Sequence, residues 1–279
     1  MFDKPFALSM GPQRAGTTWL DRYLRSRGDI CLPFDVKEIF YFDRHYDRGA
    51  EFYKSHFKPG NKDALVMEIT ATSFDCVDAP RRVLDNFGKE IRMLCPLRHP
   101  VTRSYSLYLH YSRYGIVSGS LQEAVAAMPQ IIESSFYHEH LQRWLDMFGD
   151  NSLQILYQED LETNQKGYIQ KVCEGLSLPY KEPAEDIRGK YNTTSFSKFG
   201  PLARFAQNTA DWLRAHRMYG VINCAKALGL KKVIFGKERP DAGPATMSEH
   251  DKAFLQDHLG QEVEKLEALL GHSIPQWRE

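Results

Sequence analysis

Short apolar runs alternate with longer amphipathic stretches along most of the chain. Runs of this kind are typical of buried strands, and strands that alternate with helical stretches predict a parallel sheet covered by helices. The predicted strands span residues 5–11, 29–33, 64–70, 91–98 and 152–158. We therefore expect an α/β fold with a central parallel sheet of about five strands, flanked by helices.

Two stretches space their apolar residues as an amphipathic helix does. The first ends before Gly149, and its apolar face consists of Tyr137, Leu141, Trp144, Leu145 and Phe148. The second predicts one helix from about Ser248 to Gly271, with an apolar side made of Leu255, Leu259, Val263, Leu266 and Leu270. Both patterns indicate core-facing helices that end at a glycine.

The length of 279 residues suits one large domain, which we expect to span residues 1–279 and to close with a helical region. The 36 basic side chains equal the 36 acidic ones in number, so the chain lacks the basic excess that is typical of nucleic-acid binding. Any anion site must therefore be local.

The chain shows no secretion signal, and no window approaches the roughly 18 apolar residues that a membrane span needs. Five scattered cysteines without a Cys-x-x-Cys pair indicate neither a disulfide framework nor a zinc site. We expect a cytoplasmic protein without a membrane span.

A glycine-rich turn, GPQRAGTT, connects the first predicted strand to a helix. Gly11 and Gly16 have the spacing of a nucleotide-binding phosphate loop, but Thr17 stands where a nucleotide triphosphatase needs a lysine. The remaining groups suit a single phosphate: the backbone amides from Gly16 to Thr18, two hydroxyls, and the Arg14 guanidinium. Taken alone, the turn is also compatible with threonines that only cap a helix.

A second stretch, LRHPVTRSYSLY, follows the predicted strand 91–98. Pro100 suits the first position of a helix, and Arg98 and Ser106 are placed to bind a further anion. Taken alone, this stretch is equally a helix start with incidental surface charge.

Together, the two stretches resemble the nucleotide-binding signatures of sulfotransferases that use 3′-phosphoadenosine 5′-phosphosulfate (PAPS). Three further segments resemble the Golgi-type glycan sulfotransferases and their bacterial relatives, namely KEIFYFD, QEDL and LLGHSIPQW. The resemblance implies a P-loop-type fold, PAPS as donor, PAP as product and no metal.

The resemblance also implies a role for particular residues. Glu38 is the expected general base, Arg14 stabilises the leaving phosphate, and Lys37 is a second cation near the sulfuryl group. The 5′-phosphosulfate is expected to bind at Arg14, Ala15, Gly16, Thr17, Thr18 and Trp19. The 3′-phosphate is expected at Arg98 and Ser106, while Lys198, in SFSKFGP, replaces a loop that covers the nucleotide in the family.

Several positions depart from the glycan enzymes, and two of them bear on charge. Arg14 replaces the lysine of their phosphate loop, and Ile69 replaces a lysine near the sulfuryl group. Because the expected acceptor site is less cationic, we expect a small hydroxylated or amino-bearing metabolite as acceptor, or second an uncharged sugar. Residues 200–246 are the expected lid and specificity region.

Two alternatives remain open. A metal-dependent P-loop kinase of a small molecule is disfavoured by the missing lysine, and tight magnesium-dependent ATP binding would favour it. A nucleotide-binding module without catalysis would bind PAP and transfer no sulfate.

Overall fold

The computed structural model describes residues 1–187 and 246–278. The chain divides into two compact units, which are described separately. The first unit comprises Met1–Arg103, Ser134–Tyr191 and Leu259–Glu279, and the second comprises Ser104–Glu133 and Asn192–His258. Lys198 and the expected lid, except for its last residue, lie outside the described residues.

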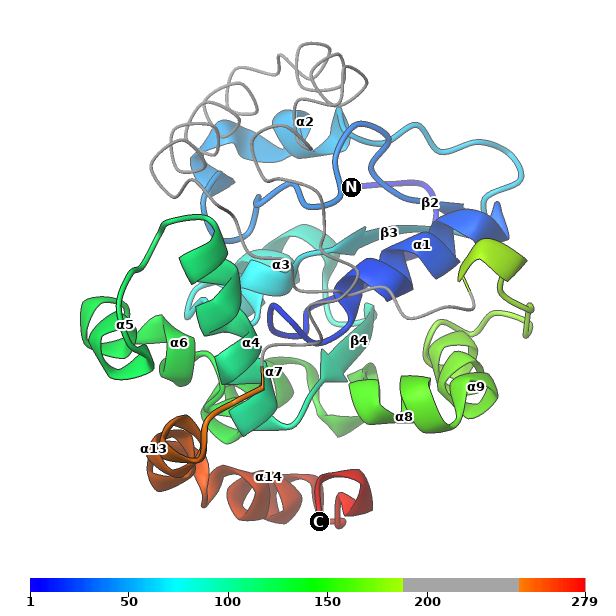
Figure 1. The fold of residues 1–279 in the computed structure, drawn as a ribbon. Coiled ribbons are helices and arrows are strands. Elements are labelled where there is room, and N and C mark those ends of the chain that lie inside the picture. The colour runs from blue at the N-terminus through cyan, green and yellow to red at the C-terminus, as the bar shows by residue number, and fades with distance from the viewer. Residues whose placement is uncertain (188–245, 279) are drawn as a thin grey trace. The chain divides into compact units, whose positions relative to one another are not determined.

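The first unit contains a five-stranded sheet in which all neighbouring strands are parallel (Figure 1). Its strands are β1 (Phe6–Ser9), β2 (Ile30–Cys31), β3 (Leu65–Ile69), β4 (Arg92–Leu97) and β5 (Leu153–Tyr157). Their order across the sheet is β2-β3-β1-β4-β5. The α/β fold class and the five predicted strands are confirmed, although each strand is shorter than its apolar run.

The described helices include the predicted amphipathic ones. They are α1 (Thr17–Arg27), α2 (Gly49–Lys54), α3 (Ala79–Phe87), α4 (Pro100–Arg113), α5 (Leu121–Ala127), α6 (Gln130–Glu133), α7 (Tyr137–Phe148), α8 (Gln158–Thr163), α9 (Gln165–Gly175), α13 (Glu249–Leu259) and α14 (Glu262–Leu270). Short 3₁₀ turns occupy Tyr46–Arg48, Ala71–Ser73, Asp150–Ser152, Glu185–Ile187 and Pro275–Trp277.

The helix predicted before Gly149 is confirmed as α7. The single helix predicted from Ser248 to Gly271 is wrong, because a turn at Gly260 and Gln261 separates α13 from α14. Glycine is a poor helix former, and its cost of about 1 kcal/mol relative to alanine favours a break at this position.

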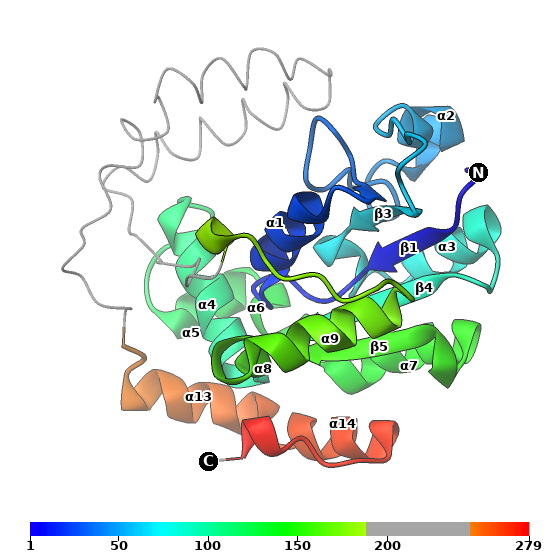
Figure 2. The same ribbon diagram turned by 90° about the vertical axis from the view of Figure 1, so that its right-hand side faces the viewer.

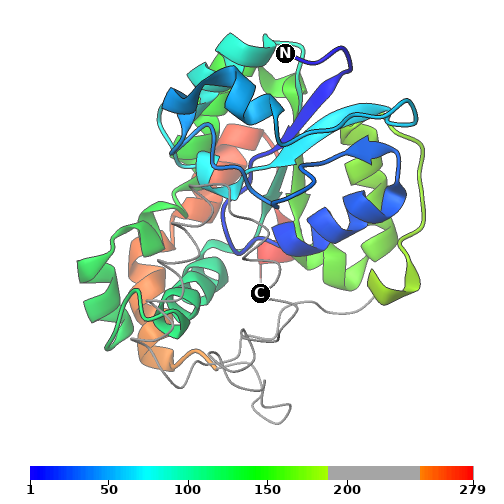
Figure 3. The same cartoon turned by 90° about the horizontal axis from the view of Figure 1, so that it is seen from above.

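The strands alternate their side chains between two apolar layers. Helices cover both sides of the sheet (Figure 3). One layer joins the sheet to α1 and α9, through Ala7, Leu20, Leu24, Met67, Leu94, Ile169 and Val172. The other layer joins it to α3, α7 and α14, through Leu8, Val66, Val83, Met93, Leu141 and Leu266. Helix α9 packs along β5, the edge strand (Figure 2).

The strand order reverses its direction between β1 and β4. The chain places β2 and β3 on one side of β1, and β4 and β5 on the other side. In open α/β sheets, ligands bind outside the carboxyl ends of the strands at such a reversal. The two stretches that the sequence singles out both follow strands at this point, one after β1 and the other after β4.

Helix α1 is held to the segment that follows α9 by a row of side-chain hydrogen bonds. Three residues spaced by four, Trp19, Tyr23 and Arg27, donate to the carbonyl oxygens of Ile187, Lys181 and Pro179 at 2.8 to 3.1 Å. This row fixes the helix whose first turn forms part of the glycine-rich loop.

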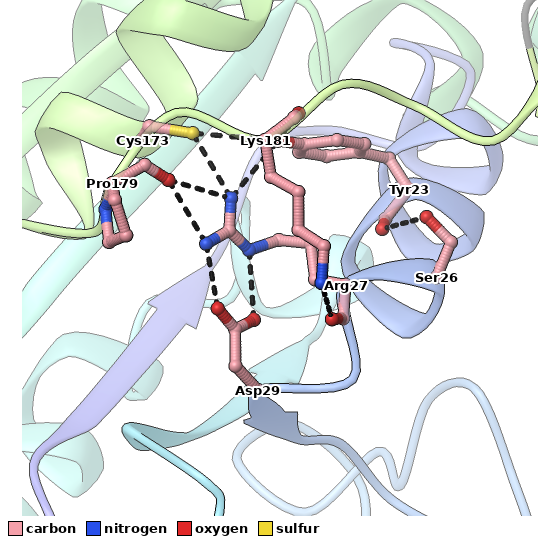
Figure 4. Close-up of polar contacts among 7 residues, drawn as sticks. All are labelled: Tyr23, Ser26, Arg27, Asp29, Cys173, Pro179 and Lys181. Atoms are coloured by element: carbon pink, nitrogen blue, oxygen red, sulfur yellow. Dashed lines mark hydrogen bonds and ion pairs between the residues drawn. The ribbon is translucent and has the colours of Figure 1, made fainter.

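The buried Arg27 guanidinium, at the end of this row, has several further partners (Figure 4). It forms an ion pair with Asp29 at 2.9 Å, and it donates to the Tyr23 hydroxyl and to the Cys173 sulfur at 3.1 and 3.3 Å. The Lys181 ammonium donates to the Arg27 carbonyl oxygen. Since most donors of Arg27 have partners, the buried charge is compensated.

The second unit contains α5, which begins with a reciprocal capping box. The Ser120 hydroxyl accepts from the Glu123 N–H, and the Glu123 carboxylate accepts from the Ser120 N–H at 2.7 Å. Within residues 1–187 and 246–278, no helix is both long and apolar enough to cross a membrane.

Candidate active site

The glycine-rich loop has the backbone geometry of an anion cradle. Gly16 is the N-cap of α1 and adopts a left-handed conformation with φ of 84°, and Arg14 is left-handed as well, with φ of 72°. A side chain at Gly11 would collide with the Pro96 carbonyl oxygen of β4, so only glycine allows the loop to lie against that strand. Because the N-cap is a glycine without a side chain, neither threonine caps α1.

The structure places the loop residues in different environments. Ala15 is fully buried, Thr17 is buried and Thr18 is exposed, while Arg14 is half-buried. The indole N–H of Trp19 donates to the Ile187 carbonyl. The Trp19 side chain therefore contacts the segment after α9.

Lys37 lies beside the loop and forms a hydrogen bond with its neighbour Glu38. The Lys37 ammonium donates to the Thr17 hydroxyl at 3.0 Å and to the Glu38 Oε1 at 3.0 Å. The side chains of Lys37 and Glu38 are 29% and 15% exposed. The other carboxylate oxygen of Glu38, Oε2, is buried and has no hydrogen-bond partner among the described residues. A buried acceptor of this kind is rare outside sites where it has a use.

The segment before Lys37 is attached to α1 and to the turn after α2. Arg25 donates to the Pro33 carbonyl oxygen at 2.9 Å, and the Phe34 N–H donates to the His56 carbonyl at 3.1 Å. The fully buried His56 ring bonds to the Asp35 carboxylate at 2.9 Å. These contacts fix the chain just before the two charged residues.

The segment after Glu38 is attached to β3 through Glu68. The Glu68 Oε1 accepts from the Ile39 N–H at 3.0 Å, and its Oε2 accepts from the Tyr53 hydroxyl at 2.8 Å. Burial raises the pKa of Glu68 from its ordinary value of 4.5 to about 8, although both hydrogen bonds oppose the shift. Phe40, which follows Ile39, has a left-handed backbone conformation with φ of 58°.

Glu68 is a residue that the sequence analysis missed. A detectable signal exists, because a carboxylate stands inside the otherwise apolar strand Leu65–Ile69. Charged residues are almost never fully buried without partners. What the sequence lacks is any indication that Ile39 and Tyr53 are those partners.

The second stretch follows β4 and begins the helix as predicted, with Pro100 as the first residue of α4. The backbone around Arg98 is held by the Tyr137 hydroxyl, which donates to the Arg98 carbonyl at 2.9 Å. The Glu159 carboxylate accepts from the His99 N–H and from the Trp277 indole, both at 2.9 Å. Burial lowers the pKa of the Arg98 guanidinium, and the charge of Glu159 opposes that shift.

Ser106 lies further along α4, is buried, and belongs to the second unit. Arg103 in the same motif is fully buried and donates to the Ser134 hydroxyl at 2.8 Å. Ile69, where the resembled enzymes have a lysine, is fully buried in the layer between the sheet and α1 and α9. It adds packing and no charge to this edge of the sheet.

Of the predicted site residues, the structure joins Thr17, Lys37 and Glu38 by hydrogen bonds. It places the turns that carry Arg14 and Arg98 after the neighbouring strands β1 and β4.

Comparisons with known proteins find relatives that are named as sulfotransferases. The human bifunctional heparan sulfate N-deacetylase/N-sulfotransferase 2 is 26% identical over 297 residues, which cover 98% of this chain and 30% of that protein. The mouse heparan sulfate glucosamine 3-O-sulfotransferase 6 is 27% identical over 204 residues, covering 68% of this chain and 56% of that protein. The chain thus spans less than a third of the length of the N-sulfotransferase relatives.

A solved sulfotransferase from Alicyclobacillus acidocaldarius has the same fold, with a TM-score of 0.70, 18% identity and full coverage of both chains. The sulfotransferase domain family matches residues 5–210, which is most of this chain. This protein therefore belongs to the sulfotransferase domain family.

Proposed function

We propose that this protein transfers the sulfuryl group of PAPS to a hydroxyl or amino group of a small polar metabolite or a sugar. The observation that carries the proposal is the Glu38 carboxylate beside the glycine-rich loop, with one oxygen on Lys37 and the other buried without a partner. A carboxylate held at that point suits a general base for the acceptor proton.

The residues of the loop fit the donor. Gly11 and Gly16 keep the loop clear of β-carbons, and the first turn of α1 offers N–H groups that have no partner within the helix. On the proposed roles, Arg14, Ala15, Gly16, Thr17, Thr18 and Trp19 bind the 5′-phosphosulfate, and Arg98 and Ser106 bind the 3′-phosphate. Bound PAPS supplies an activated sulfuryl group whose leaving group is a phosphate.

Each charged residue beside the loop has a defined task in this proposal. Glu38 accepts the proton of the acceptor group through its unpartnered oxygen while that group attacks in line with the breaking bond. Arg14 and the amino end of α1 stabilise the negative charge that grows on the leaving phosphate. Lys37 orients Glu38 and offers positive charge to the sulfuryl oxygens.

The acceptor is proposed as a small metabolite or a sugar that carries little charge. The chain has equal numbers of basic and acidic side chains, whereas strongly anionic polymers bind to basic surfaces. The apolar Ile69 adds no cation at this edge. The relatives named for heparan sulfate favour a sugar, so both classes belong in the screen.

The test is Glu38→Gln, assayed by sulfate transfer from labelled PAPS to a panel of metabolites and sugars. The variant should lose about 100-fold or more in turnover, since a positioned base contributes about that much, while its affinity for PAP changes little. Glu51→Gln, an exposed glutamate on α2, is the matched control and should keep full turnover.

Three results would reject parts of the proposal. Near-normal turnover of Glu38→Gln would remove Glu38 as the base. PAP binding without transfer to any acceptor would indicate a nucleotide-binding module, and tight magnesium-dependent ATP binding would indicate a kinase.

A further inference from the structure

A second carboxylate, that of Glu68, bonds to the residue after Glu38 and has no place in the mechanism above. Glu68 is fully buried on β3, and its side chain lies on the same face of the sheet as Val66. Val66 and Tyr53 of α2 belong to the same apolar layer. Both of its oxygens accept hydrogen bonds, one from the Ile39 N–H and one from the Tyr53 hydroxyl. An apolar residue of similar volume would fill the same space at no desolvation cost, so the retained carboxyl group calls for a specific reason.

The contact with Ile39 supplies that reason. Before Lys37, the last attachment of the chain is the Val36 carbonyl oxygen, which accepts from Arg25 at 3.2 Å. After Glu38, the next backbone N–H is that of Ile39, and Glu68 is its acceptor. Between these attachments lie Lys37 and Glu38, and Lys37 donates both to Thr17 of the glycine-rich loop and to Glu38.

We propose that Glu68 is a positioning residue, which holds the Glu38 carboxylate against the glycine-rich loop through its hydrogen bond with the Ile39 N–H. The inference rests on the proposed role of Glu38 as general base. It assigns Glu68 no contact with donor or acceptor.

The charged and titratable groups around Glu68 determine whether its carboxyl group is protonated. Burial is the largest influence and raises the pKa of Glu68. The hydrogen bonds from the Ile39 N–H and the Tyr53 hydroxyl lower this pKa, while the carboxylates of Glu38 and Asp43 raise it further. Tyr41 adds a further hydroxyl next to Tyr53. With a pKa of about 8, Glu68 is mostly protonated at pH 7 and gains a negative charge at higher pH.

Ionisation of Glu68 therefore places a second negative charge behind Glu38. The proposed donor is itself an anion, so that charge should weaken the productive complex as the pH rises through about 8. A glutamine in this position keeps an oxygen for the Ile39 N–H and offers an N–H to the Tyr53 oxygen, but it cannot ionise.

The experiment compares three variants in the labelled-PAPS assay, with PAP affinity and thermal unfolding measured in parallel. Glu68→Met removes the acceptor of the Ile39 N–H at similar volume, and should lower kcat at least tenfold while the affinity for PAP changes less than threefold. Glu68→Gln should keep kcat within about threefold at pH 7. Tyr53→Phe removes the other partner of Glu68, and should lower stability while leaving kcat nearly unchanged.

The pH profile is the readout that a merely structural role would not change. Wild-type activity should fall above about pH 8, and Glu68→Gln should keep its activity there. This comparison of wild type with Glu68→Gln tests the proposal even if Glu68→Met does not fold.

Unchanged kcat in Glu68→Met, or equal losses of kcat in Glu68→Met and Tyr53→Phe, would overturn the positioning role. So would identical pH profiles of wild type and Glu68→Gln. Because Glu38→Gln is assayed alongside, an active Glu38→Gln signals failure of the proposed function, whereas an inactive Glu38→Gln with a fully active Glu68→Met signals failure of this inference alone.

Discussion

Arg14 stands in the glycine-rich loop at the position where the resembled glycan enzymes have a lysine, and it does so in a left-handed backbone conformation. A guanidinium offers a planar fork to two oxygens, and a lysine offers a compact point charge. Either cation can stabilise charge on a leaving phosphate, provided that it is held in place.

Replacing Arg14 therefore separates charge from geometry. We expect Arg14→Met to lower kcat about 100-fold and PAP affinity much less, because charge on the leaving oxygen grows only in the transition state. Arg14→Lys keeps the charge, faces the same backbone cost, and should keep a substantial part of kcat. Steady-state kinetics and calorimetry with PAP check both values, and equal losses in kcat and PAP affinity would make Arg14 a binding residue only.

Arg98 should give the protein its preference for nucleotides that carry a 3′-phosphate. Charge-assisted hydrogen bonds to a phosphate contribute about 1.5–3 kcal/mol, so Arg98→Met should reduce the preference for PAP over AMP by about 10- to 100-fold. Arg92→Met is the matched control, because Arg92 begins β4, the strand that Arg98 follows, and its guanidinium donates to the Leu176 carbonyl oxygen. A preference that survives in Arg98→Met would move the 3′-phosphate site elsewhere.

At the scale of elements, the position of α1 depends on the contacts of Arg27, the last residue of the helix. Arg27 is buried with only 1% of its side chain exposed, while its partner Asp29 keeps 30% exposure. Removing one member of such a pair leaves the other partly desolvated and without its partner, and also leaves the Pro179 carbonyl oxygen without its donors.

We expect Arg27→Met to lower the free energy of unfolding by about 2–3 kcal/mol, since the pair is only partly buried. The double variant Arg27→Met/Asp29→Asn should lose less than the sum of the two single losses, because the second change removes the unpaired carboxylate. Urea denaturation of the four proteins measures this, and strictly additive losses would show that the pair is not coupled.

The elements themselves were largely predictable from the sequence. Five apolar runs became the five strands, and the apolar face before Gly149 became α7. The break at Gly260 was missed, because the apolar spacing continues across it and outweighs a single glycine in the pattern. Strand order does not follow from the runs, since it depends on contacts between residues far apart in the chain.

The candidate site was also only partly predictable, because some of its contacts join residues far apart in the chain. Glycine spacing and the pair Lys37 and Glu38 form local patterns, and the structure joins them through Thr17. Glu68 and Glu159 bond to backbone N–H groups 29 and 60 residues away. No local pattern identifies such partners, so these two supports came only with the fold.

For the whole molecule, Glu68 links stability to pH. Its pKa in the folded state, about 8, lies above its ordinary value of 4.5, so the folded protein holds this proton more tightly than the unfolded chain does. The stabilisation is complete below about pH 4.5 and declines as the pH rises towards about 8.

We expect wild type to lose more free energy of unfolding than Glu68→Gln between pH 5 and about 8.5, as measured by urea denaturation. The comparison isolates Glu68, because the carboxyl groups of Asp75 and Glu262 also have raised pKa values and remain in both proteins. Parallel curves for the two proteins would mean that Glu68 is already ionised, or still neutral, across this range.

The contact of Gly11 with Pro96 has a consequence for donor choice. It ties the turn after β1 to the neighbouring strand, and the axes of neighbouring strands lie only about 4.8 Å apart. The two turns cannot separate to accommodate a longer molecule without breaking the sheet. On the proposed roles, the enzyme therefore selects its donor by the distance between the two phosphates as well as by their charge. An analogue with an extended linker between its two phosphates should fail to contact both turns at once.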